Sequence, residues 1–148
     1  IDWNLLEKNK DLFEFFKFMI DYRKKHPVIR KKLDNAVCGM EAMHAHDVNA
    51  ERMEVPQNAK TLAVSFAGYD RKKGKDDLVY VAVNAYWEEV KITLPNLANH
   101  GAWYLSVDTY GDEKGKYFYQ EGEEIRIDRE YVMKPRSIVV FTGREILR

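Results

Sequence analysis

Two histidines and an aspartate in the stretch "HAHD", at positions 44–47, are the first group of side chains that could do chemistry. Residues two apart on a strand share a face, so the imidazoles of His44 and His46 could bind one metal ion. No third ligand follows at a suitable spacing. We therefore expect partly exposed strand histidines in preference to a metal site, and we predict no metal and no cofactor.

The single cysteine, Cys38, is a second candidate. A nucleophilic thiol needs a base such as histidine nearby in space. The surrounding "AVCGM" is apolar, which disfavours the thiolate that a nucleophile requires. We interpret Cys38 as a small buried residue.

Adjacent carboxylates suggest glycoside hydrolysis, which needs two such groups about 5 to 10 Å apart across a cleft. Neighbours on a strand point to opposite faces, so an adjacent pair does not make that geometry. We therefore predict no catalytic residue and expect surface carboxylates in three pairs: Asp76 with Asp77, Glu88 with Glu89, and Glu123 with Glu124.

Three aromatic residues, Tyr86, Trp87 and Trp103, are candidates for substrate binding. A flat exposed ring can stack on the face of a sugar. A tryptophan at a strand end more often closes a core or packs on a helix. Both alternatives stay open for these three residues.

The composition sets limits on the class of protein. Lys plus Arg and Asp plus Glu number 24 each among 148 residues, so no charge excess favours nucleic acid or an anionic membrane. No apolar run approaches the roughly 20 residues that cross a bilayer, and no signal-peptide pattern opens the chain. One cysteine suits a reducing compartment, so we predict a cytoplasmic location. The first residue, Ile1, is not methionine, which suggests a piece of a longer protein.

Residues 2–27 are predicted to form one long helix. Asn4 and Glu7 have capping-box spacing, and Pro27 ends the segment. Two apolar stripes run along this helix at helical spacing, more than one sheet face would bury. We therefore expect the helix to lie between two partners. The first stripe contains Leu12, Phe13, Phe16, Met19, Ile20 and Arg23, and the second contains Phe15, Phe18 and Tyr22.

The remainder is predicted to be mainly β. Residues 28–58 have no sustained period and resemble a connector followed by an edge strand. The period then changes to two, with polar turns between short runs. The run 78–84 is apolar on both faces, as in a central strand. In the run 90–94, alternation places Val90, Ile92 and Leu94 inward, and we expect "AYWE" to connect the two runs as a hairpin. About eight short strands indicate an antiparallel β-sandwich or barrel. The other strand-like segments are "TLAVSFAGY", "WYLSVDTY", "EEIRI", "EYVM" and "RSIVVFTG".

Four ordered motifs resemble the C-terminal region of bacterial glycogen debranching enzymes, in the isoamylase-like branch of the α-amylase superfamily. The segment 1–30 is similar to the last barrel helix, and "YVAVNAYWEEVKITLP" is similar to a hairpin of the C-terminal β-sandwich. "WYLSVDT" and "KPRSIVVF" resemble two later strands of that domain. Between residues 40 and 58, where the family has a tryptophan–histidine–glycine turn, "AMHAHD" lacks both the tryptophan and the glycine, so the resemblance assigns no role to His44. The matching residues are Trp3, Leu5, Leu6, Asn9, Asp11, Leu12, Arg23, Lys24, His26, Pro27, Trp103, Asp108, Thr109, Pro135, Arg136 and Ser137.

The resemblance implies that residues 1–30 are the terminal barrel helix with its connector, and that residues 31–148 are an α-amylase-type C-terminal sandwich. The parent would hydrolyse α-1,6 branch linkages in glycogen or related α-glucans. Its catalytic carboxylates would come from earlier strands of a (β/α)8 barrel, upstream of Ile1. The chain alone should then be inactive, with the catalytic barrel as its partner.

Two other functions remain as alternatives. One is a carbohydrate-binding module that stacks α-glucan on exposed tryptophan. The other is a protein-interaction domain, including self-association through the N-terminal helix. The protein-interaction alternative rests on the apolar stripe of the helix that a single sheet face would leave exposed.

Overall fold

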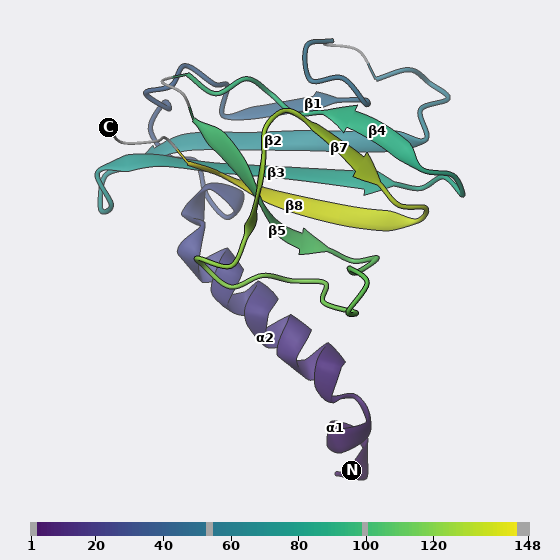
Figure 1. Cartoon of the computed structure of the whole chain (residues 1–148). Coiled ribbons are helices and arrows are strands. Elements are labelled where there is room, and N and C mark those ends of the chain that lie inside the picture. The colour runs from purple at the N-terminus through teal and green to yellow at the C-terminus, as the bar shows by residue number, and fades with distance from the viewer. Residues whose placement is uncertain (1–2, 53–54, 99–100, 145–148) are drawn as a thin grey trace.

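A computed structural model describes residues 3–52, 55–98 and 101–144. Within them the chain forms a helix in two parts, a short 3-10 helix and eight strands (Figure 1). The predicted helix start at Asp2 lies outside the described residues. The elements are α1 (Asn4–Lys8), α2 (Lys10–Lys25), η1 (Pro27–Ile29), β1 (Met43–His46), β2 (Thr61–Asp70), β3 (Lys75–Asn84), β4 (Val90–Thr93), β5 (Ala102–Asp108), β6 (Ile125–Ile127), β7 (Glu130–Met133) and β8 (Ser137–Arg144).

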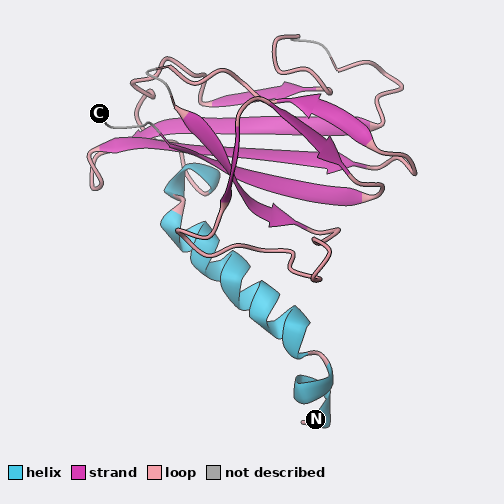
Figure 2. Cartoon of the chain, viewed as in Figure 1, coloured by secondary structure: helices cyan, strands magenta, loops and turns pink. Residues whose placement is uncertain are grey.

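The strands make two antiparallel sheets, which confirms the predicted mainly β fold. The larger sheet has the order β1-β2-β3-β8-β5-β6, and β4 pairs with β7 in the smaller sheet. Figure 2 shows the helices gathered on one side of the strands. The N-terminal end of the helix projects beyond the sheet (Figure 1).

The larger sheet is covered on both faces, which explains its doubly apolar central strand. On β3, Leu78, Tyr80 and Ala82 belong to the core between the two sheets. Val79 and Val81, which alternate with them, pack in the core beneath α2. β3 pairs with β2 on one side and β8 on the other, so the prediction of a central strand is confirmed.

The prediction of a hairpin between residues 78–84 and 90–94 is wrong. Both edges of β3 are already occupied, so β4 crosses to the smaller sheet and pairs with β7. The buried Asn84 organises this crossing: its amide nitrogen donates to the carbonyls of Glu88 (2.9 Å) and Lys134 (3.0 Å). Its side-chain oxygen accepts from the backbone N–H of Tyr86 at 3.0 Å. "AYWE" is therefore a connection between sheets.

The predicted facing of β4 is confirmed, because Ile92 and Leu94 are fully buried and Lys91 is exposed.

The predicted single helix is wrong in one respect. Asn9, with φ −112° and ψ 30°, interrupts it between α1 and α2. Trp3, not the predicted Asn4, holds the N-cap position of α1.

Candidate functional site

The first candidate site is an exposed apolar surface on the helix, which we call the helix face. Its side chains are between 47% and 74% exposed. An apolar surface of this extent on the outside of a folded domain commonly marks a contact with a partner. The helix face consists of Trp3, Leu5, Leu6, Leu12, Phe13, Phe16 and Ile20.

The opposite side of α2 packs on the larger sheet. Phe18 and Tyr22 are buried there, and Phe18 lies 4.7 Å from Phe118 between ring centroids. Of the two predicted apolar stripes, the one with Phe15, Phe18 and Tyr22 packs on the sandwich. Most of the other stripe remains on the surface.

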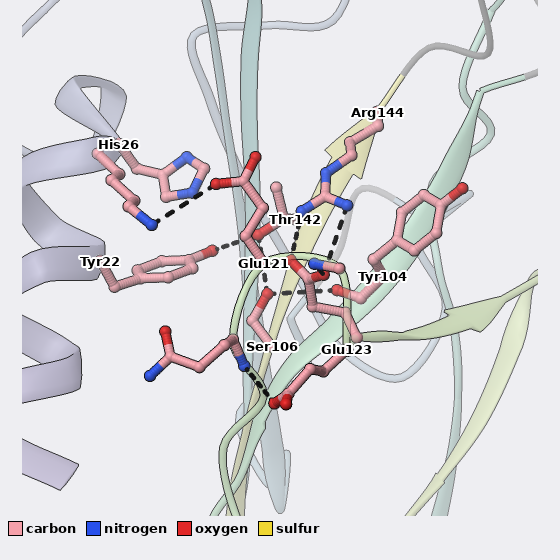
Figure 3. Close-up of polar contacts among 12 residues, drawn as sticks. Tyr22, His26, Tyr104, Ser106, Glu121, Glu123, Thr142 and Arg144 are labelled. Atoms are coloured by element: carbon pink, nitrogen blue, oxygen red, sulfur yellow. Dashed lines mark hydrogen bonds and ion pairs between the residues drawn. The ribbon is translucent and has the colours of Figure 1, made fainter. Parts of the chain in front are cut away.

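The second candidate site is a cleft between α2 and the larger sheet, with a volume of about 480 Å³. Its floor holds three hydroxyl groups in a row (Figure 3). The hydroxyl of Tyr22 lies 2.8 Å from Oγ1 of Thr142, which in turn lies 2.9 Å from Oγ of Ser106. Ser106 sits where the β5–β8 register shifts between Leu105 and Val107, and a bulge of this kind re-aims a side chain.

Burial raises the pKa of Tyr22 well above its ordinary value, since the helix and sheet exclude water from its hydroxyl. The Tyr22 phenol therefore stays protonated to a higher pH than an exposed phenol does. It can donate one hydrogen bond and accept another.

A buried carboxylate closes one end of the cleft. Asp77 accepts from Nδ1 of His26 at 2.6 Å and from the backbone N–H of Val28 at 3.0 Å. The end of α2 is thereby held on β3. Its neighbour Asp76 points elsewhere and accepts from the N–H groups of Val37 and Cys38.

Ion pairs line the mouth of the cleft (Figure 3). Lys25 on α2 lies 3.5 Å from Glu121, and Arg144 pairs with the buried carboxylate of Glu124. Glu123 instead pairs with Lys116 at 2.9 Å. Adjacent carboxylates thus take different partners. The expectation that they serve only surface solubility is wrong for Asp77 and Glu124, because both are buried in structural contacts.

The three aromatic residues predicted to bind substrate lie in different settings. Trp87 is 65% exposed, whereas Trp103 is buried in the core and donates its indole N–H to the carbonyl of Pro95 at 2.7 Å. The Tyr86 ring contacts Trp87 at 4.2 Å between centroids, and Nζ of Lys60 lies 3.7 Å from its centre. The buried ring of Trp103 therefore has no face on which a sugar could stack. Trp87 offers the more open ring.

His44 and His46 do share a face of β1, with ring centroids 5.9 Å apart. His46 is fully buried, so the expectation of partial exposure is wrong for that residue. Its Nδ1 lies 2.7 Å from the carbonyl of Asp47. Among the described residues, no three His, Cys, Asp or Glu side chains gather as a possible metal site. Cys38 is only partly buried, against the edge of the core between the sheets.

The hydroxyl row and the Asp77 contacts were not foreseen as a site. A weak signal exists: Ser106 and Thr142 interrupt otherwise apolar strand segments, "YLSVD" and "VVFTG". A hydroxyl at an inward strand position needs a partner. The sequence does not show which residue is that partner, because Tyr22 and Thr142 are 120 residues apart in sequence.

The structure defines a mainly β, sandwich-type domain with a helix docked on one sheet. The model of the isoamylase C-terminal domain matches residues 36–142, which is most of the chain. The chain belongs to this family, a noncatalytic domain of isoamylase-like enzymes that is associated with their catalytic domain. The search of curated proteins gave no match.

The family match begins after the helix, so it covers the sandwich and the cleft's strands but not α1 and α2. In the described part of the chain, neither helix has the length and apolar character needed to span a membrane.

Proposed function

We propose that the chain is the noncatalytic C-terminal domain of a cytoplasmic glycogen debranching enzyme, and that it stabilises the parent's catalytic barrel. The parent would hydrolyse α-1,6 branch linkages in glycogen or related α-glucans. Residues 1–30 would form the last barrel helix and its connector, and residues 31–148 the sandwich domain. The family match supports the class of enzyme.

The observation that carries the stabilising role is the helix face. Its seven apolar side chains are exposed from Trp3 through α1 and α2, and the side of α2 that carries Phe18 and Tyr22 is bound to the sandwich. Burying a phenylalanine contributes about 1.5–3 kcal/mol. A barrel seated on this surface would gain several such contributions. The helix would then link the two domains.

The test compares substitutions in the parent enzyme and in the chain alone. Phe16→Glu should lower the parent's melting temperature and leave the chain's unchanged, because Phe16 is 59% exposed in the chain. Leu62→Glu on β2, where the side chain is 46% exposed, is the control and should change neither. Equal effects of Phe16→Glu and Leu62→Glu in the parent would refute docking through the helix face.

The purified chain should also fail to hydrolyse branched α-glucan. Measurable debranching by the chain alone would overturn its assignment as noncatalytic.

The surface that docks a barrel could instead pair two copies of the chain. Sedimentation at increasing concentration measures this self-association, and a strict monomer would argue against it.

A carbohydrate-binding role is the second candidate, and the exposure of Trp87 favours it. Malto-oligosaccharide stacked on this indole should change tryptophan fluorescence in a saturable manner. Trp87→Ala should abolish the change. A titration without saturation would leave the binding-module hypothesis without support.

A further inference from the structure

The cleft between α2 and the larger sheet has the size and lining of a small-molecule site. Its volume of about 480 Å³ falls within the roughly 300–1,000 Å³ of such sites. Phe18, Leu78 and Tyr119 supply apolar surface, and the hydroxyl row supplies polar groups at the floor.

The hydroxyl row has hydrogen-bonding capacity to spare. Oγ of Ser106 also lies 3.5 Å from the carbonyl of Tyr104, which can accept from it. If Ser106 donates to this carbonyl, Thr142 donates to Ser106, and Tyr22 donates to Thr142. The Tyr22 oxygen then remains as an acceptor. With the whole row reversed, Ser106 donates to Thr142 and Thr142 donates to Tyr22, so the Tyr22 proton is free to be donated and the Tyr104 carbonyl no longer accepts from Ser106.

A group that can switch between donor and acceptor matches another hydroxyl, which has the same property. It can also donate to a carboxylate or accept from an ammonium, so the charges around the cleft decide between these ligands and a hydroxyl. The chemistry of the floor is compatible with a hydroxylated ligand.

The charges around the cleft point to a neutral ligand. The lining includes six carboxylates against five lysine or arginine side chains, with His26 in addition. Several are already paired, among them Lys25 with Glu121 and Arg144 with Glu124. Because the charges nearly balance, neither an anion nor a cation would meet a surplus of unpaired opposite charge.

We propose that this cleft binds a small neutral polyhydroxylated molecule, a hexose ring or an open-chain polyol. The ligand's hydroxyls would bond to the row of Tyr22, Thr142 and Ser106, and its C–H surface would lie on Phe18 and Tyr119. The site is independent of the proposed barrel docking, because α2 presents a different side to each.

The cleft is also distinct from the surface around Trp87. Leu78 lines the cleft near one end of β3, and Asn84 ends the strand just before Trp87. Six residues of strand separate them by about 20 Å. A hexose in the cleft cannot touch Trp87, so the two sites can be tested separately.

The experiment titrates glucose, sorbitol and glucose 6-phosphate into the whole chain and follows backbone amides by two-dimensional NMR. We expect glucose and sorbitol to shift the amides of Ser106, Thr142 and Gly143 in a saturable manner. Glucose 6-phosphate should bind at least about tenfold more weakly, because its phosphate would be desolvated without a surplus of positive charge to pair with.

Two variants test the hydroxyl row. Thr142→Val keeps the shape of the side chain but removes its hydroxyl, and should weaken binding roughly tenfold, as the loss of one buried hydrogen-bond partner does. Tyr22→Phe, a second variant, removes the terminal hydroxyl and should weaken binding similarly. Trp87→Ala is the matched control and should leave the affinity unchanged. Circular dichroism verifies that each variant is folded.

Four results would overturn the proposal. The first is the lack of any saturable shift with either neutral probe. The second is equal or tighter binding of glucose 6-phosphate. The third is shifts centred on Trp87 that disappear in Trp87→Ala. The fourth is unchanged affinity in a folded Tyr22→Phe or Thr142→Val variant.

Discussion

Replacing Asp77 by asparagine should loosen α2 from the sandwich. The carboxylate, 3% exposed, accepts from Nδ1 of His26 at 2.6 Å and from the N–H of Val28 at 3.0 Å. Asparagine keeps the shape but presents a donor where the second oxygen stood. If the asparagine oxygen accepts from the Val28 N–H, its amide faces Nδ1 of His26, which can bond to it only after giving up its proton to become the other tautomer.

The expected loss of stability follows from these contacts. Breaking a buried, hydrogen-bonded charged group costs about 3–5 kcal/mol. Asparagine still accepts one of the two bonds, so we expect about 3 kcal/mol. For a chain of this size, each kcal/mol lowers the melting temperature by about 2–4 °C, which gives a decrease of about 6–12 °C. Domains are commonly stable by about 5–15 kcal/mol, so the variant should still fold.

Urea denaturation followed by circular dichroism measures the loss, and hydrogen exchange at Val28 locates it. Asp76→Asn is the matched control, because that carboxylate accepts from Val37 and Cys38 and not from the helix end. It should leave exchange at Val28 unchanged. If Asp77→Asn costs less than about 1 kcal/mol, or does not speed exchange at Val28, the carboxylate does not hold the helix.

Four further predictions concern the buried interior. Tyr80→Phe should be neutral or stabilising by up to about 1 kcal/mol in urea denaturation, because within the described residues the Tyr80 hydroxyl has no hydrogen-bond partner. A loss of stability of more than about 1 kcal/mol would contradict this. Burial raises the pKa of Tyr22 and Tyr80, so above pH of about 10 the unfolded chain loses protons that the folded chain keeps. Stability should then fall by up to about 1.4 kcal/mol per pH unit for each tyrosine, and a flat urea midpoint would refute it. Burial lowers the pKa of His46, so below pH of about 6.5 the unfolded chain takes up a proton that the folded chain does not. The free energy of unfolding should therefore decline as the pH falls, and His46→Phe should flatten this decline in an acid titration. Gly143→Ala should cost about 1–3 kcal/mol in thermal unfolding, since the new Cβ would lie 2.8 Å from the Cβ of Leu78. An unchanged melting temperature would contradict this and would mean that β3 and β8 move apart to make room for the methyl group.

The sequence predicts the strands well and their pairing less well. Alternation correctly identifies the buried positions of β4 and the doubly buried β3, because each strand's pattern records the environment of its own two faces. The pattern does not record which strand lies beside it. The crossing at Asn84 depends on carbonyls of Glu88 and of Lys134, 50 residues away from Asn84 in sequence. Helical spacing likewise shows two apolar stripes on α2 without indicating which one the sandwich covers.

Polar contacts along the helix explain which stripe is covered. The hydroxyl of Tyr117 donates to the carbonyl of Asp11 near the start of α2, at 2.8 Å. Tyr22 reaches Thr142 in the last turns of α2, and His26 reaches Asp77 just beyond its end. All of these contacts lie on the same side of the helix as Phe18.

Apolar burial is non-directional, so either stripe could have provided adhesion to the sheet. Hydrogen bonds are directional, and each buried polar group is costly without its partner. A helix rotated to bury Phe16 and Ile20 would leave Thr142 and Asp77 without their helix partners. The polar contacts therefore set the rotation of α2, and with it the outward direction of the helix face. If that face docks on a barrel as proposed, the sandwich contributes to docking by fixing the helix in the orientation that presents it.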